Sequence, residues 1–228
     1  MPVSSDFPYD LVMFDLDGTL LETAPELADA VNDTLTALDL APVDPTRVRD
    51  WIGNGVRAML AQALASASAQ SLEAIRGSER LDQAVRVFEP LYAARCGSNS
   101  WPYPQVEHVL RQWHALGTRL AIVTNKDSRF TKLLLECHGL APWFQRVIAG
   151  DTLGRKKPAP EGILDCLAHF EVAPARALFI GDSSIDVATA RNAGVRVWVR
   201  AAGYNQGQPI TDSQPDRVFD GYADLLRD

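Results

Sequence analysis

The sequence predicts an α/β protein, with a Rossmann-like parallel sheet and an all-helical domain inserted after the first strand. Three observations lead to this prediction. Short apolar runs alternate with helical patterns in the second half of the chain, most of these runs end in polar residues, and a long stretch near the N-terminus has helical patterning alone. Alternating strands and helices are typical of a parallel sheet covered by helices on both faces.

The predicted strands are short and apolar, and they cover residues 9–14, 119–123, 146–149, 177–180 and 195–199. Helical patterns occupy residues 128–138, 160–170 and 184–193 between them. Right-handed crossovers place the carboxyl ends of all parallel strands at one edge of the sheet. Ligands bind outside that edge in such sheets. The polar residues that follow the strands are therefore candidates for one site.

The predicted inserted domain begins just after the first strand. Residues 21–98 contain no convincing strand, whereas residues 59–69 and 72–92 have helical patterning. Thr23 and Glu26 have the spacing of a capping box, with Pro25 tolerated in the first turn. We therefore predict a helical domain over residues 21–98 and an α/β core domain over residues 1–20 and 99–228.

The charge balance and the cysteines restrict the possible partners and the compartment. The 29 acidic residues outnumber the 22 basic ones, so we expect no nucleic-acid partner and no membrane. Cys96, Cys137 and Cys166 form no Cys-x-x-Cys pair and are odd in number, which is typical of reduced thiols. The first residues lack a basic segment followed by an apolar run. These features predict a cytoplasmic protein.

Two carboxylates, Asp15 and Asp17, follow the first predicted strand. Residues two apart on a strand point the same way, and two close anions repel each other. A divalent cation would offset this repulsion, and Mg²⁺ favours such hard oxygen ligands. Asp182, after another strand, would add a third oxygen, and Gly18 lets the backbone approach a ligand. An ordinary Asp-Gly turn is the alternative interpretation of the pair.

Thr124 and Lys157 each lie in a loop near the predicted sheet edge. The Thr124 hydroxyl and the following backbone N–H would hold a phosphoryl oxygen, although such a threonine is often only a turn or helix cap. The Lys157 ammonium would neutralise developing charge, and Pro158 fixes the backbone beside it. A solvated basic loop is the alternative, and we prefer it for Arg155 and Lys156.

Asp182 and Asp186 lie four residues apart across a predicted strand-to-helix junction. They can face one site from there. Ser183 and the two acids would also cap the helix, because serine and aspartate are good N-cap residues. The two interpretations are compatible with each other.

Taken in order, these segments resemble the four motifs of the haloacid dehalogenase superfamily, from about residue 14 to residue 194. The segments are Asp-x-Asp-Gly-Thr, a strand-end Thr, Lys-Pro-x-Pro and Gly-Asp-Ser-x-x-Asp. The resemblance implies that Asp15 is the nucleophile and that Asp17 is the general acid and base. It also implies that Thr124 binds the phosphoryl group and that Lys157 steadies the nucleophile and the phosphate.

The same resemblance implies a magnesium site and a cap. Asp15, the backbone carbonyl of Asp17 and the side chain of Asp182 would hold Mg²⁺, with Asp186 and Ser183 in support. The inserted helices resemble the superfamily's helical cap of the first type. Among the residues beside the motifs, we predict that the following contact substrate: Gly18, Thr19 and Asn125.

A narrower resemblance, to the family of bacterial phosphoglycolate phosphatases, is carried by four segments: residues 51–55, 122–126, 150–151 and 203–205. Gln105 and Ala202 depart from that pattern, in which a glycine and a small polar residue would stand. The cap residues that would read the non-phosphate end of the substrate are Gly53, Asn54 and Gly55, with Arg57 as a partner for a carboxylate. An ordinary interhelical turn and a solvated arginine are the alternatives.

The resemblance implies a Mg²⁺-dependent phosphomonoester hydrolase that forms an aspartyl phosphate. Its expected partner is a small anionic phosphate ester, foremost 2-phosphoglycolate, which would yield glycolate and phosphate. A phosphatase for a sugar phosphate or a nucleotide is one alternative. A phosphosugar mutase is another, although Thr19 favours a phosphatase because the mutases resemble this pattern with valine there. A non-catalytic phosphate-binding protein is a third. A monomer and a homodimer both stay open.

Overall fold

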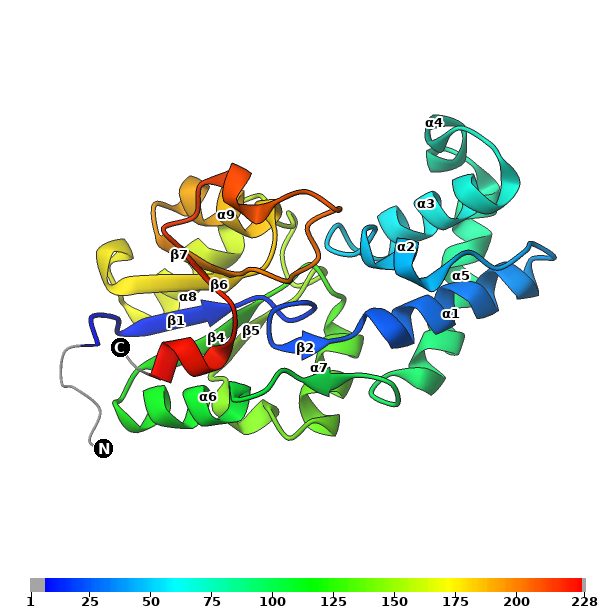
Figure 1. Cartoon of the computed structure of the whole chain (residues 1–228). Helices are drawn as coiled ribbons and strands as arrows, with labels where there is room; N and C mark the ends of the chain where they lie inside the picture. The colour runs from blue at the N-terminus through cyan, green and yellow to red at the C-terminus, as the bar shows by residue number, and fades with distance from the viewer. Residues whose placement is uncertain (1–6, 227–228) are drawn as a thin grey trace.

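The computed structural model describes residues 7–226 and has a parallel sheet between two layers of helices (Figure 1). Within the described residues the sheet has six strands in the order β5-β4-β1-β6-β7-β8. The predicted α/β fold is therefore confirmed, while residues 1–6 and 227–228 of the predicted core domain lie outside the described residues. The strand bounds are β1 Leu11–Phe14, β4 Arg119–Val123, β5 Arg146–Ile148, β6 Ala177–Gly181, β7 Arg196–Arg200 and β8 Arg217–Phe219.

The strand register brings the ends of β1, β4 and β6 together. Phe14, the last residue of β1, is paired with Ile122 of β4 and with Ile180 of β6. All three strands are parallel, so their carboxyl ends lie at one edge of the sheet. The loops that follow them start side by side and carry Asp15, Asp17, Thr124 and Asp182, while Lys157 lies in the loop after β5.

Helices cover both faces of the sheet (Figure 1). Val12 and Phe14 pack on one side with Trp113 of α6, and Leu11 and Met13 pack on the other with α8 and α9. Because both faces of β1 are buried, its four residues are continuously apolar. The helices are α6 Val106–Ala115 and α7 Ser128–Cys137 on the first side, and α8 Glu161–Phe170 and α9 Ser184–Ala193 on the second.

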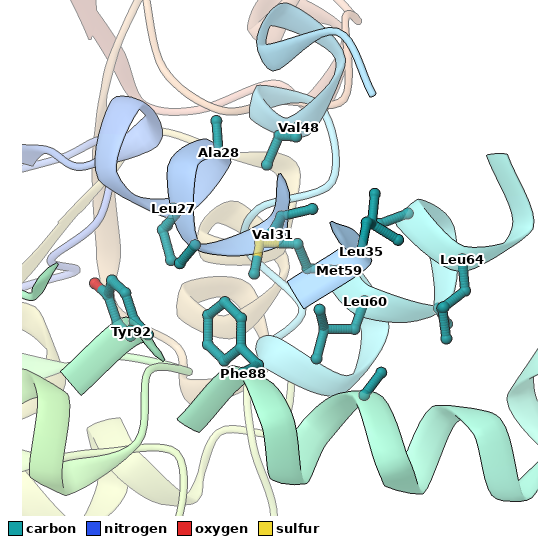
Figure 2. Close-up of a cluster of buried hydrophobic side chains, with 14 of the residues drawn as sticks. Leu27, Ala28, Val31, Leu35, Val48, Met59, Leu60, Leu64, Phe88 and Tyr92 are labelled. Carbon is teal, nitrogen blue, oxygen red and sulfur yellow. The ribbon is translucent and has the colours of Figure 1, made fainter. Parts of the chain in front are cut away.

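Five helices form the inserted segment beside the sheet (Figure 1). The predicted helix over residues 72–92 is interrupted at Gly77, and Ser78 accepts a hydrogen bond from Leu81 N to start a new helix. Side chains of α1, α2, α3 and α5 share one apolar cluster (Figure 2). The bounds are α1 Ala24–Ala37, α2 Pro45–Arg49, α3 Val56–Ser68, α4 Leu72–Arg76 and α5 Glu79–Arg95. Among residues 7–226, no helix has the length and apolar character needed to span a membrane.

Two details differ from expectation where the inserted segment leaves the core. β2 Leu21–Glu22 pairs antiparallel with β3 Trp101–Pro102, because the outgoing and returning chains run side by side there. The predicted capping box is wrong, since the Thr23 hydroxyl donates to Asp17 Oδ1 at 2.7 Å instead of capping α1. Glu26 accepts bonds from the Tyr92 hydroxyl and the Gly97 N–H.

Candidate active site

Three buried acids meet at the carboxyl edge of the sheet. Asp15 follows β1 and Asp182 follows β6, and Asp186 lies in the first turn of α9. One oxygen from each of the three lies within 4.8 Å of the others. All three side chains are buried, and repulsion between neighbouring anions in such a place is strong.

Lys157 neutralises part of this charge. Its Nζ lies 2.8 Å from Asp15 Oδ2 and 2.7 Å from Asp186 Oδ1. Burial disfavours the ammonium, but attraction by Asp15 and Asp186 outweighs it and raises the pKa of Lys157. Lys157 therefore stays cationic beside the predicted nucleophile. Even so, burial keeps the pKa of Asp15 above its usual value, with Lys157 opposing the rise.

Asn125 holds the Lys157 loop in place. Its Oδ1 accepts the Lys157 N–H at 2.8 Å, and its Nδ2 donates to the Lys157 carbonyl at 3.1 Å and to the Gly53 carbonyl at 2.9 Å. The Lys157–Pro158 peptide bond in this loop is cis. Asn125 thus joins the end of β4, the lysine loop and the turn that precedes α3.

Asp182 is enclosed by two loops, one containing Gly18 and the other containing Gly203. Thr19 Oγ1 donates to its Oδ1 at 2.8 Å, and Tyr204 N donates to its Oδ2 at 2.5 Å. A Cβ on Gly18 would lie 2.2 Å from Asp182 Oδ2, and one on Gly203 would lie 2.3 Å from Asp182 Cβ. Only glycine fits at either position, and the φ of +79° at Gly18 also favours it.

The acidic cluster fits a hard divalent cation. Burial, and then repulsion by Asp186 and Asp15, raises the pKa of Asp182, so an added cation would relieve a real electrostatic cost. Asp186 is already bonded within the chain. Its Oδ2 accepts the Ser183 N–H and hydroxyl, which shapes the start of α9 as the capping interpretation predicts.

The Asp17 side chain is not part of that cluster and is bound by Lys126. Lys126 Nζ lies 3.0 Å from Asp17 Oδ1 and 3.1 Å from Oδ2, and it lies 4.9 Å from the centre of the Tyr92 ring. With its carboxylate held by Lys126 and Thr23, Asp17 is outside the acidic cluster. This arrangement is compatible with the expected use of its backbone carbonyl. Lys126 is not among the predicted site residues, although it follows Thr124 by only two positions.

A pocket lies between the sheet edge and the inserted helices. Its core side combines the two motif acids with the residues after β4, namely Asp15, Asp17, Thr124, Asn125 and Lys126. Its helical side carries Leu27, Ile52, Gly53, Gly55, Val56 and Met59. Figure 2 shows Leu27 and Met59 at the same apolar cluster, so this wall belongs to the helical core.

The structure brings two of the four predicted cap residues to the pocket. Gly53 and Gly55 line it, while Asn54 is exposed and is not part of its lining. Arg57 is also outside the lining, and its Nη1 lies 2.6 Å from Asp82 Oδ1 with both side chains about half exposed. The roles of Asn54 and Arg57 in substrate binding stay predictions.

A polar cluster around Glu22 contacts the loops of Gly18 and Gly203, which enclose Asp182. Glu22 accepts bonds from the hydroxyls of Tyr204 and Tyr103, and Arg49 lies 3.2 Å from it. Burial would raise the pKa of Glu22, but these three partners lower it below its usual value. Arg200 donates to the Gly18 carbonyl at 2.9 Å. Tyr204 has a sequence signal, since it lies within residues 203–205, whereas Glu22, Arg49 and Arg200 have none.

The fold and this site define an α/β enzyme with acids gathered at the strand ends. Residues 12–199 match the family model described as haloacid dehalogenase-like hydrolase. The chain therefore belongs to that family, as its four motifs predict, and it is an enzyme.

Two named proteins and one solved structure are similar to this chain over nearly all of its length. A phosphoglycolate phosphatase from Psychrobacter arcticus is 38% identical over 95% of this chain and 94% of its own length. Phosphoglycolate phosphatase 1 from Pseudomonas aeruginosa is 39% identical over 95% of this chain and 78% of its own length. A crystal structure of a predicted phosphoglycolate phosphatase from Haemophilus somnus has a TM-score of 0.90 and 32% identity, and covers 97% of this chain and 98% of that one. The predicted resemblance is confirmed.

Proposed function

We propose that this phosphoric monoester hydrolase converts 2-phosphoglycolate to glycolate and phosphate through an aspartyl phosphate on Asp15. One observation carries the proposal. The Asp15 carboxylate lines the pocket with Lys157 Nζ 2.8 Å away, and Asp17 and Thr124 line the same pocket. A nucleophile, a proton carrier and a phosphoryl-binding hydroxyl thus surround one space. The names of the similar proteins support the choice of ester.

The reaction runs in two steps on the chain's own residues. An Asp15 oxygen attacks phosphorus, the bond to the ester oxygen breaks, and Asp17 gives that oxygen a proton. Asp17 then removes a proton from a water, which attacks the aspartyl phosphate and releases phosphate and the Asp15 carboxylate. Lys157 neutralises charge beside Asp15, and the Thr124 hydroxyl donates to a phosphoryl oxygen.

The proposed magnesium ligands are the side chains of Asp15 and Asp182 and the backbone carbonyl of Asp17. When bound, Mg²⁺ would supply positive charge for the phosphoryl oxygens. Asp186 and Ser183 would support this site without binding the ion, because their polar atoms are bonded to each other and Asp186 also binds Lys157.

The helical wall of the pocket favours a short ester over a sugar phosphate. Leu27, Ile52 and Met59 offer no polar side-chain atom to a sugar hydroxyl. A hydroxyl that is buried without a partner lowers affinity. This apolar wall counts against the sugar phosphatase and the phosphosugar mutase. The presence of Asp17 and Thr124 in the same pocket as Asp15 counts against a non-catalytic binding protein.

The test is a comparison of kcat/KM over phosphate monoesters in the presence of Mg²⁺. We expect 2-phosphoglycolate to exceed ribose 5-phosphate, glucose 6-phosphate and AMP, with free phosphate as the product. A higher kcat/KM on a sugar phosphate or on AMP would contradict the assigned ester. An isomerised sugar phosphate would identify a mutase, and absence of turnover on every ester would identify a binding protein.

A further inference from the structure

Lys126 is the lysine that lines the pocket, and the part of the chain that the structure describes places no arginine in that lining. It binds a different carboxylate from Lys157. Lys126 is bonded to Asp17, whereas Lys157 is bonded to Asp15 and Asp186. Lys157 therefore lies beside the proposed nucleophile, Asp15. Lys126 places a positive charge beside Asp17, which is proposed to protonate the leaving group.

The Lys126 ammonium is buried and held in position. Only 4% of its side chain is exposed, and its Nζ lies over the Tyr92 ring. Burying an ammonium is costly unless strong partners hold it. Its two bonds to Asp17 leave a third ammonium proton for another acceptor. A buried cation in a pocket wall, with a donor to spare, suits an anionic group on a ligand.

The helical side of the pocket is apolar, which disfavours substrates with hydroxyl groups. Leu27, Ile52, Val56 and Met59 line it, so the side chains on the helical side of the pocket lining carry no hydrogen-bonding group, while the Tyr92 hydroxyl, outside that lining, donates to Glu26. The N-terminal end of α3 lies there too, because its N-cap Gly55 and first residue Val56 both line the pocket. The positive end of a helix favours an anion at the same wall.

We propose that Lys126 binds the anionic group on the leaving half of the substrate, and that the apolar wall rejects hydroxyl-rich esters. This inference rests on the proposed phosphatase function and names the feature by which the substrate is chosen. In 2-phosphoglycolate a single carbon separates the ester oxygen from the carboxylate. A cation in direct contact with Asp17 matches that spacing, since Asp17 protonates the ester oxygen while Lys126 binds the carboxylate.

The test compares two esters of similar size, 2-phosphoglycolate and 2-hydroxyethyl phosphate, which has an alcohol in place of the carboxylate. In Lys126→Gln, which keeps a donor near Asp17 but loses the charge, kcat/KM for 2-phosphoglycolate should fall about 10- to 100-fold. The value for 2-hydroxyethyl phosphate should fall about 10-fold less, because the loss of the Lys126 contact with Asp17 is common to both esters. Lys126→Arg should keep part of the preference.

Lys132→Gln is the matched control, because it removes the same charge from α7 at a side chain that is 76% exposed. It should leave both values unchanged. An equal fall on both esters in Lys126→Gln would show that Lys126 acts through Asp17, and would overturn the proposal. An unchanged preference for 2-phosphoglycolate would overturn it as well, while leaving the proposed function intact.

Two further measurements keep the test decisive. If wild type hydrolyses both esters without preferring 2-phosphoglycolate, the proposed substrate and the role of Lys126 both fail. If Lys126→Gln does not fold by circular dichroism, product inhibition of wild type decides. Glycolate should inhibit hydrolysis of 2-hydroxyethyl phosphate competitively and ethylene glycol should not, whereas equal inhibition by the two would overturn the proposal.

Discussion

The two walls of the pocket differ in polarity. On the sheet side, Asp15 lines the pocket and has Asp182 and Lys157 beside it; all three are buried, and each has at least two polar partners. On the helical side, Leu27 and Met59 contribute apolar surface from the helical cluster. Buried charges require fixed partners, whereas an apolar wall can change shape or size at smaller cost. From this contrast we infer that the reaction depends on the sheet edge, and that the choice of ester depends on the facing apolar wall together with Lys126.

The largest effect should come from the sheet side. Asp15→Asn should lower kcat at least about 10⁴-fold on every ester, because the amide is a poor nucleophile. The amide oxygen can still accept the Leu16 N–H bond, so the fold should persist. Phosphate release and circular dichroism measure the two properties. Turnover at the wild-type rate would show that Asp15 is not the nucleophile.

Metal removal should abolish activity reversibly, and its effect on stability should depend on pH. Burial raises the pKa of Asp182 in the folded state, so its favourable contribution is complete at low pH and is lost as pH rises through the raised pKa. Mg²⁺ offsets that loss. The Mg²⁺-induced rise in Tm should therefore be larger at about pH 8.5 than at about pH 5.5. The Asp182→Asn variant should show a smaller and flatter rise, and an equal rise in that variant would exclude Asp182 as a ligand.

Gly203→Ala should disturb the sheet side without removing any functional group. The new Cβ would meet Asp182 Cβ at 2.3 Å, so the loop must move, and kcat/KM should fall about 100-fold. Gly154→Ala is the matched control, because its Cβ would meet nothing within 4 Å. Comparable activity of the two variants would show that the close packing around Asp182 is not needed.

A substitution on the helical side should change the ratio of kcat/KM between two esters without abolishing hydrolysis. Val56→Thr adds a hydroxyl to the apolar wall at nearly constant volume. It should raise kcat/KM for ribose 5-phosphate relative to 2-phosphoglycolate by about 3- to 10-fold. Val87→Thr on α5, outside the pocket lining, is the control. An unchanged ratio in Val56→Thr would mean that this wall does not select the ester.

The smallest effect is expected at Arg57. It is paired with Asp82 at the surface and does not line the pocket, so Arg57→Ala should change kcat/KM on any ester by less than about 3-fold. Its Tm should fall by no more than a few degrees, measured beside Asp82→Ala. A large loss confined to 2-phosphoglycolate would instead restore Arg57 as the partner of the carboxylate.

Much of the core could be predicted because its signals are local. The strand β4 and the helix α9 have the predicted bounds, and β1 begins two residues later than predicted. The short β8 is not among the predicted strands, because its three residues carry only one buried side chain. β2 and β3 were also beyond prediction, since two residues have no periodicity and pair only when the chain returns.

The sequence by itself determined five of the six described strands of the core sheet and the acids and lysine near their ends, through apolar periodicity and strand-end position. The motifs indicated the family through resemblance. Only the tertiary structure decided how Lys126, Arg57 and Glu22 are used. Lys126 meets Asp17 across 109 positions and Glu22 meets Tyr204 across 182, so neither contact leaves a local pattern. Side-chain direction and burial, which set the partners of a charge, exist only after the distant segments have packed.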